Sequence, residues 1–146
     1  MVWSIQECAA QDCRAIGEGL VAYNLRQVPM TQREPFISVN RKAVDESGTL
    51  LAGCIAEIYC WNVAYVELLW VDERYRGMGL GSKLLAEVER TAVEAGCTLI
   101  HLDTFDFQAK DFYLRHGSEV FGVLEDCPEG HCRYYLKKKL AQRQEV

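Results

Sequence analysis

The sequence predicts an α/β protein whose central sheet is mixed, mostly antiparallel and flanked by helices. Three strand-like apolar runs lie between Phe36 and Val71, an amphipathic helical pattern covers Gly79–Ala95, and shorter strand and helix patterns alternate after it. No repeat, low-complexity tract or linker rich in proline, glycine or serine interrupts the 146 residues. We therefore expect a single domain that comprises residues 1–146.

The expected order of elements is β-α-β-β-β-α-β-α-β-β, with a strand ahead of the first helix. Apolar residues recur at helical spacing from Ala10 to about Leu25, and Pro29 marks the limit of that helix. In the helix at Gly79–Ala95, leucine, valine and alanine form one stripe opposite a charged face. The other expected elements are strands at Phe36–Val44, Thr49–Tyr59, Ala64–Val71, Thr98–Asp103, Glu119–Leu124 and Cys132–Leu140, and a short helix near Gln108–His116.

The charge balance and the apolar runs exclude two classes of function. Lys and Arg number 16 and Asp and Glu 21, for a formal net charge of -5, so no basic surface for nucleic acid is expected. The apolar runs are far shorter than the roughly 20 residues that span a bilayer. The N-terminus lacks the pattern of a signal peptide, which predicts a cytoplasmic protein without a membrane partner.

The cysteines point to reduced thiols rather than to disulfides or a metal. Seven cysteines, odd in number and scattered, are typical of a reducing compartment. The fragment from Cys127 to Cys132 also holds the His131 imidazole, but a zinc site needs four convergent ligands and the others would have to come from unrelated elements. A zinc-stabilised binding domain is therefore a minor alternative, and no metal site is expected.

A glycine-rich stretch joins the strand that ends at Val71 to the long helix. Gly77, Gly79 and Gly81 free the backbone to direct several N–H groups toward one place at a helix N-terminus, where the partial positive charge favours a phosphate. The spacing fits neither a dinucleotide fingerprint, whose third glycine falls on Ser82, nor a P-loop. Taken alone, the stretch is either a pyrophosphate cradle or a flexible loop that caps a helix.

Two motifs in the same order as in a known family favour the cradle. Arg76-x-x-Gly-x-Gly, between a hydrophobic strand and an amphipathic helix, resembles the acetyl-CoA signature of the GNAT N-acetyltransferase superfamily. The stretch Asp106–Gly117, in which an alanine precedes Phe-Tyr and a glycine opens the next strand, resembles the second cofactor motif of that family. Similarity to small bacterial-type members extends to Leu68–Glu73, Leu102–Phe105, Phe107–Ala109 and Pro128–His131.

The resemblance implies a GNAT-like fold that takes acetyl-CoA as co-substrate. Backbone N–H groups of the glycine-rich stretch would hold the pyrophosphate, and the main chain of Leu69 and Val71 would hold the acetyl carbonyl and the pantetheine arm. Asp106 stands where many members of the superfamily have an asparagine that faces the pantetheine. The cofactor-binding residues implied in this way are Leu69, Val71, Arg76, Gly77, Met78, Gly79, Leu80, Gly81, Ser82 and Asp106.

Two side chains are the expected catalytic groups. The Tyr113 phenol, with an ordinary pKa of about 10, stays protonated at neutral pH and suits a general acid for a thiolate leaving group, although a tyrosine beside Phe112 is also typical of packing. Glu67 is the expected base, with an ion pair as the alternative and with Glu57 and His131 in reserve. Period two puts Glu67 and Val71 on one face unless a bulge reverses that relation.

These residues predict an N-acetyltransferase that moves an acetyl group from acetyl-CoA to a primary amine of a small molecule or peptide. Direct transfer in a ternary complex is favoured because no cysteine is tied by sequence to a histidine in a nucleophile pattern. The alternative is a non-catalytic acyl-CoA-binding module. By analogy with related folds, Tyr23, Asn24 and Trp61 are expected near the acceptor pocket, and a homodimer is left open.

Overall fold

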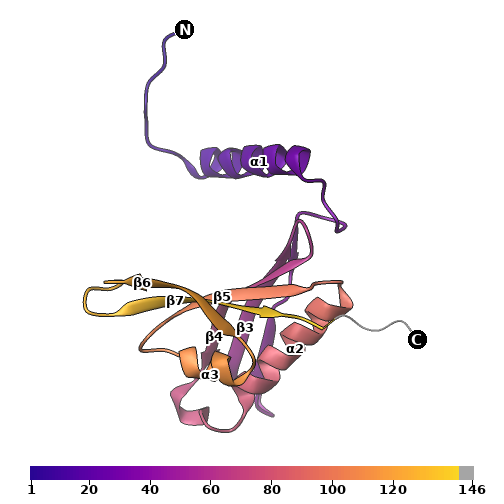
Figure 1. The fold of residues 1–146 in the computed structure, drawn as a ribbon, viewed down its shortest axis with the longest axis vertical. Coiled ribbons are helices and arrows are strands. Elements are labelled where there is room, and N and C mark those ends of the chain that lie inside the picture. Colours follow the sequence, from indigo (N-terminus) through magenta and orange to yellow (C-terminus); the bar gives the residue numbers. More distant parts are fainter. Residues whose placement is uncertain (142–146) are drawn as a thin grey trace.

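The computed structural model describes residues 1–141 and contains one seven-stranded sheet (Figure 1). The strands lie in the order β1-β3-β4-β5-β7-β6, and β2 also pairs with β3. Every pairing is antiparallel except the one between β4 and β5, so the predicted mixed sheet is confirmed. The elements are α1 (Ala10–Gln27), β1 (Phe36–Ser38), β2 (Arg41–Val44), β3 (Leu50–Tyr59), β4 (Val63–Val71), the 3-10 turn η1 (Glu73–Tyr75), α2 (Leu80–Glu94), β5 (Leu99–Phe105), α3 (Lys110–Arg115), β6 (Glu119–Glu125) and β7 (Cys132–Lys139).

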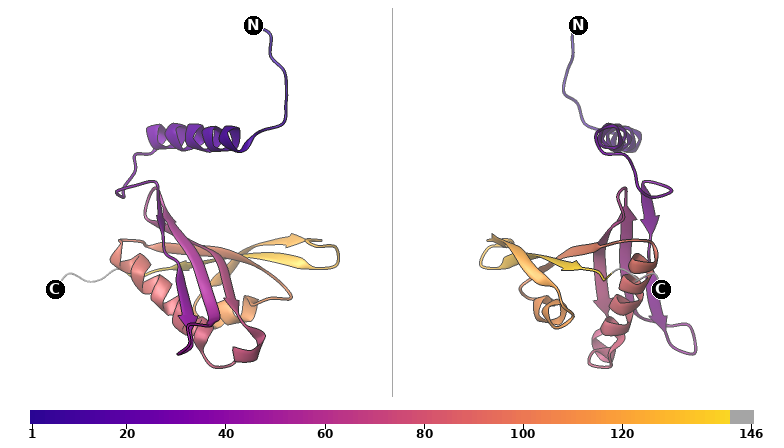
Figure 2. Two further views of the ribbon diagram at one scale, coloured as in Figure 1. Left: turned by 180° about the vertical axis from the view of Figure 1, so that it is seen from behind. Right: turned by 45° about the vertical axis from the view of Figure 1, so that its right-hand side comes forward.

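The N-terminal part differs from the prediction. Residues 1–9 form no strand, and α1, although its predicted limits are nearly right, stands apart from the sheet in all views (Figures 1 and 2). No residue of α1 is buried. A strand needs a partner edge for its N–H and C=O groups, and a segment that precedes a detached helix lies away from every edge of this sheet. The expectation of a first strand was therefore wrong.

The single strand expected at Phe36–Val44 is divided into β1 and β2, which both pair with β3. At the break, the Val39 N–H donates to the Ala56 carbonyl over 2.8 Å, and the Asn40 side-chain oxygen accepts the Ala56 N–H over 3.3 Å. A side-chain amide thus takes the place of one backbone partner, which satisfies the ladder while the chain changes course.

One face of the sheet carries the core. Helices α2 and α3 pack on this face, and the apolar stripe of α2 that the sequence predicts is buried there. The opposite face has no helical cover within residues 1–141, as the turned view in Figure 2 shows. The fully buried residues of the core include Ala52, Cys54, Ile58, Leu85, Val88, Ala92, Cys97 and Leu136.

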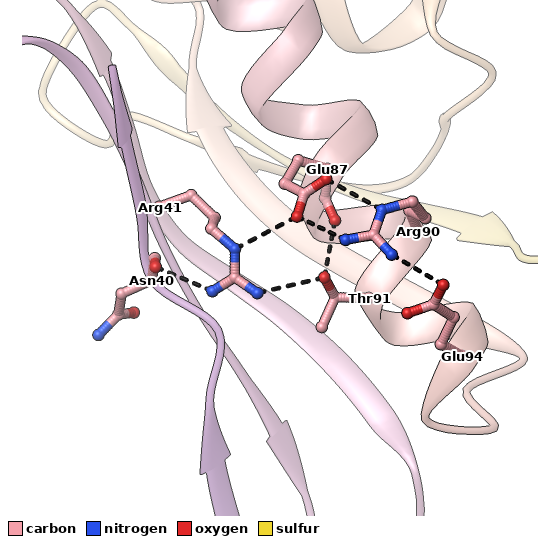
Figure 3. A network of polar contacts seen from close by, with 6 residues as sticks. All are labelled: Asn40, Arg41, Glu87, Arg90, Thr91 and Glu94. Carbon is pink, nitrogen blue, oxygen red and sulfur yellow. Dashed lines mark hydrogen bonds and ion pairs between the residues drawn. The ribbon is translucent and has the colours of Figure 1, made fainter. Parts of the chain in front are cut away.

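A polar network fixes α2 against the edge of the sheet (Figure 3). Arg41 of β2 reaches the Glu87 carboxylate over 3.5 Å and the Thr91 hydroxyl over 3.3 Å. Arg90 pairs with Glu87 over 2.6 Å and with Glu94 over 2.7 Å. Because these groups are partly exposed and screened by water, each pair adds little stability, so the network orients the helix more than it stabilises it. Within the described residues, no helix is long and apolar enough to cross a membrane.

Candidate functional site

A cleft forms where two neighbouring strands of the sheet part. Strands β4 and β5 pair only over Val63–Val66 and Leu99–Leu102, whereas β5 stays with β7 as far as Phe105. Beyond this point the space between β4 and β5 opens into a cleft of about 590 Å³. It is lined by residues from β4, the glycine-rich loop, the start of α2, the end of β5 and α3, among them Glu67, Leu69, Val71, Arg76, Gly77, Gly79, Leu80, Gly81, Ser82, Phe112 and Tyr113.

A β-bulge in β4 marks the start of this cleft. Ile55 of β3 pairs with Leu68 and the next residue, Ala56, pairs with Val66, which leaves Glu67 as an extra residue without a partner of its own. A bulge breaks the alternation of side chains. The carboxylate of Glu67 therefore lies on the sheet face opposite the Val71 side chain. The two side chains would share a face only in a strand without a bulge, so that expectation is wrong and the bulge reverses their relation.

The backbone of β4 beyond the bulge directs its polar groups into the cleft. The Asp72 N–H donates to the Leu51 carbonyl over 2.9 Å, which identifies that pair as a hydrogen-bonded one. Hydrogen-bonded and non-hydrogen-bonded pairs alternate along an antiparallel ladder. Leu69 and Val71 therefore turn their N–H and C=O groups away from β3, toward the side that β5 has left. Arg76 is consistent with this direction, because its Nε donates to the Val71 carbonyl over 3.2 Å.

The glycine-rich stretch forms a concave turn that leads into α2. Gly77 and Gly79 have φ values of 81° and 82°, a left-handed region that favours glycine. Gly79 is the N-cap of α2, and the first helical N–H that bonds back along the chain is that of Lys83, to the Gly79 carbonyl. The N–H groups of Leu80, Gly81 and Ser82 thus remain available at a helix N-terminus, which suits a phosphate.

Because Gly81 has no side chain, this end of the cleft stays open beside Phe112 and Val71. A Cβ atom built on Gly81 would lie 3.5 Å from the Phe112 ring and 3.6 Å from a methyl group of Val71. A methyl group fits at those distances, but a longer side chain would enter the cleft. Met78, which the resemblance also assigned to the cofactor, has its side chain exposed and outside the cleft lining, so any contact from it would come from its backbone.

Tyr113 forms part of the cleft wall from the first turns of α3. Its side chain is buried against Phe112, yet its hydroxyl has no hydrogen-bond partner within residues 1–141. Every fully buried side-chain oxygen in that part of the chain has a hydrogen-bond partner. The Tyr113 hydroxyl has none, so it is not fully buried and is accessible from the cleft. Burial, with smaller contributions from Cys54 and Asp103, raises the pKa of Tyr113 well above its usual value, so the phenol keeps its proton at neutral pH.

The structure does not bring Asp106 into this cleft. Its carboxylate accepts a hydrogen bond from His131 Nδ1 over 2.9 Å and from the Cys132 N–H over 3.0 Å. Burial opposes the charge of Asp106, but these two donors outweigh it and lower the pKa of the carboxyl. Asp106 thus ties the turn after β5 to the β6–β7 connection, and its predicted contact with pantetheine stays a prediction.

Two side chains, those of His116 and Gln108, make contacts that support the site and were not foreseen from the sequence. His116 donates from Nδ1 to the Phe112 carbonyl over 2.7 Å, and its Nε2 lies 2.9 Å from the Ser82 hydroxyl. In a neutral ring Nε2 accepts, so Ser82 donates and the end of α3 is joined to the start of α2. The side-chain oxygen of Gln108, which lines the cleft, accepts the Phe105 N–H at the end of β5 over 2.9 Å. The spacing of Phe112 and His116, one helical turn apart, was the available signal for the first contact.

On the uncovered face, charged and aromatic groups border the cleft. Asp103 accepts hydrogen bonds from Arg133 Nε over 2.9 Å and from the Tyr65 hydroxyl over 3.0 Å. Burial, assisted by Asp103, raises the pKa of Tyr65 to about 12. Asp103 is therefore occupied by its own partners, whereas Glu67 is an exposed carboxylate at the cleft with no ion pair to any described residue.

No cysteine of the described residues lines the cleft. Cys54, behind its wall, is fully buried, and this burial raises the pKa of its thiol to about 11. A thiol in this state is a poor nucleophile. Within residues 1–141, no group of three or more His, Cys, Asp or Glu side chains could hold a metal ion.

Comparison with known proteins identifies the family. The sequence matches the family described as "Acetyltransferase (GNAT) family" over residues 6–117. The chain belongs to the GNAT acetyltransferase family. It is therefore an acyltransferase, and acetyl-CoA, the acetyl donor of this family, is its co-substrate. The residues present fit that donor, because the free N–H groups at α2 suit a pyrophosphate and the open β4 backbone lies further along the same cleft.

Relatives cover most of the chain. A blasticidin-S acetyltransferase from Streptomyces morookaense is 38% identical over 80% of this chain and 85% of its own length. An acetyltransferase from Agrobacterium fabrum is 30% identical over 86% of this chain and 89% of its own length. The crystal structure of an acetyltransferase from Bacillus cereus is 35% identical, covers 94% of this chain and 98% of its own chain, and has a TM-score of 0.86.

We predict that Gly81→Leu weakens acetyl-CoA binding, whereas Gly81→Ala preserves it. Alanine adds a methyl group at ordinary contact distance from Phe112 and Val71, while leucine extends into the cleft beside the helix N-terminus. Isothermal titration with acetyl-CoA should show affinity weakened more than about tenfold for leucine and nearly unchanged for alanine. Equal affinity in the two variants would mean that the donor does not pass Gly81.

Proposed function

We propose that this enzyme transfers an acetyl group from acetyl-CoA directly to a primary amine of a small molecule or peptide. The observation that carries the proposal is the cleft between β4 and β5, which is bordered by the α2 N-terminus, by the Tyr113 hydroxyl and by Glu67. Leu69 and Val71 direct backbone groups into it, and Glu67 lies on the opposite sheet face. Donor and acceptor would therefore approach from different sides and meet within the sheet.

The residues divide the work along the cleft. The N–H groups of Leu80, Gly81 and Ser82 would bind the pyrophosphate, and the Leu69 N–H would donate to the thioester carbonyl, where negative charge develops during acyl transfer. The Val71 carbonyl already has Arg76 as a partner, so Arg76 holds this part of β4 in position. Because these are backbone groups in fixed elements, little reorganisation would accompany reaction.

Proton transfer is assigned to the two side chains. Glu67 would accept the first proton of the ammonium acceptor, directly or through water, and Tyr113 would protonate the departing thiolate and regain a proton when the new amide nitrogen loses its second one. The pKa of Tyr113 is raised by burial, so its acid form persists at every pH below about 10. A route through an acetyl-cysteine is disfavoured because no described cysteine reaches the cleft and the thiol of Cys54 is held protonated.

Three observations support a cationic small-molecule amine as acceptor. The chain carries a net charge of -5, and Glu67 is an exposed carboxylate without an ion-pair partner in the described part of the chain. The Streptomyces relative is named for acetylation of blasticidin S, a small molecule. Carboxylate at the acceptor side would attract an ammonium group and hold it near the base.

The first test is a panel of amines, with blasticidin S, polyamines, aminoglycosides and short peptides, assayed for acetyl-CoA-dependent release of free CoA thiol. We expect turnover with at least one small cationic amine and none with acidic amino acids. The product should carry the acetyl group on a primary amine, as measured by mass spectrometry. Tight acetyl-CoA binding without turnover on any amine would instead favour the non-catalytic acyl-CoA-binding module.

Tyr113→Phe should lower kcat by about 10²-fold or more and leave acetyl-CoA affinity nearly unchanged, because only the acidic hydroxyl is lost and the ring that packs against Phe112 is kept. The matched control is Tyr134→Phe, whose ring packs under Lys110 outside the cleft and should retain activity. In the wild type, kcat should show no alkaline loss from Tyr113 below about pH 10, since the pKa of the phenol is raised. Unchanged kcat in Tyr113→Phe would remove the acid assignment.

Glu67→Gln should reduce kcat/KM by about 10²-fold or more near neutral pH, because the amide cannot accept the ammonium proton. The loss should shrink as the pH rises toward the pKa of the acceptor amine, where the free amine is already present. Glu57→Gln, on the neighbouring strand, serves as control and should behave like the wild type. The reverse result, with a loss only in Glu57→Gln, would transfer the base role to Glu57.

A further inference from the structure

The N-terminal arm, defined here as residues 1–27, lacks the contacts that a stable helix requires. Its helix α1 has 18 residues, none of them buried, and contains Gly17 and Gly19 near its centre with open space around both. Each glycine costs roughly 0.5–1 kcal/mol in a helix interior relative to alanine, and most of the stability of a helix in a protein comes from tertiary packing of its apolar face. The arm therefore needs a surface to pack on.

The apolar side chains of α1 form a stripe that faces solvent. Ile16, Leu20 and Tyr23, spaced by about one helical turn, are each more than half exposed. The hydrogen bonds that anchor the arm to the body lie in the linker after the helix, where Trp61 Nε1 donates to the Val28 carbonyl over 2.9 Å. The linker is thus fixed on the body while the helix beyond it extends away (Figures 1 and 2).

The sheet offers a matching surface that no part of the described chain covers. On the face opposite α2, Ile55, Leu68 and Trp70 are 41%, 56% and 48% exposed. We call these three residues the bare patch. Sheets of globular proteins bury their apolar face against a second layer, and an 18-residue helix of about 27 Å is long enough to cross several strands.

The exposed area is large enough for an interface between two chains. The chain exposes 10438 Å², whereas a compact monomer of 16.6 kDa exposes about 7,600 Å², an excess of about 2,800 Å². Even half of this excess is more than the roughly 800 Å² that each partner contributes to a stable interface. Every chain has one arm and one bare patch, so two copies can cover both surfaces if the arm of each chain packs on the patch of the other.

We propose that the protein is a two-fold dimer in which each chain lays its α1 across the bare patch of the other. The exchange buries the Ile16–Leu20–Tyr23 stripe and the patch in both copies at once. It also brings the second chain to the outer side of the cleft, because Leu68 and Trp70 border it. The assignment of this side of the cleft to the acceptor rests on the proposed function. Tyr23 and Asn24, which do not line their own cleft, would then reach the acceptor side of the other copy.

The test combines mass in solution with hydrogen exchange of α1 in the full-length protein. Light scattering during size-exclusion chromatography should give twice the 16.6 kDa of one chain, and α1 amides should exchange slowly. Leu20→Asp on the stripe and Ile55→Asp on the patch should each give a monomer of native circular dichroism in the β region. Ala22→Asp, which adds the same charge on another side of α1, should remain a dimer.

Ile55→Asp decides the site of docking, because it changes the body and is read out in the arm. The α1 amides should exchange at least about tenfold faster in this variant than in the wild type. Acetyl-CoA affinity should be unchanged in Ile55→Asp, since Ile55 does not line the cleft, and this separates the dimer from the proposed reaction. A monomeric wild type, or a dimer in which Ile55→Asp leaves α1 protected, would overturn the proposal.

Discussion

The separation of β4 from β5 is the constraint on which the site depends. Strand β5 remains paired with β7 along its whole length, while an extra residue at Glu67 bends β4 away. Two neighbouring strands in one sheet thereby leave the backbone groups of Leu69 and Val71 without a strand partner. Unpaired N–H and C=O groups in a sheet carry a cost unless water or a ligand pairs with them, so the parting creates a place for an extended ligand.

The other elements secure the walls of this opening. The turn after β4 is fixed by Asp72, whose carboxylate accepts the Arg74 N–H over 2.9 Å. The pair formed by Ser82 and His116 joins the start of α2 to the end of α3. Because both walls rest on one buried core, the helix N-terminus and the Tyr113 hydroxyl keep a fixed separation. A preorganised arrangement of this kind is what electrostatic catalysis of acyl transfer requires.

The two sides of the sheet have different chemical character. The side of α2 and α3 presents backbone N–H groups and a helix N-terminus, which suit an anionic donor. The other side presents the Glu67 carboxylate and the aromatic side chains around Asp103 and Arg133, which suit a cation. The bulge separates these sides, because it is the reason that Glu67 and Val71 face in opposite directions. A single inserted residue thus gives the two sides of the cleft their different chemical character.

The sequence by itself determined the α/β class, the limits of α2 and the place of the glycine-rich stretch, because apolar periodicity and glycine requirements are local properties. It also determined that Tyr113 belongs to the motif that follows β5. Only the tertiary structure decided which way Glu67 faces, since a bulge is a mismatch between two strands. Likewise, the engagement of Asp106 with His131 and the detachment of α1 depend on what packs nearby. Contacts between residues that are far apart in the sequence produce no periodic pattern by which the sequence could predict them.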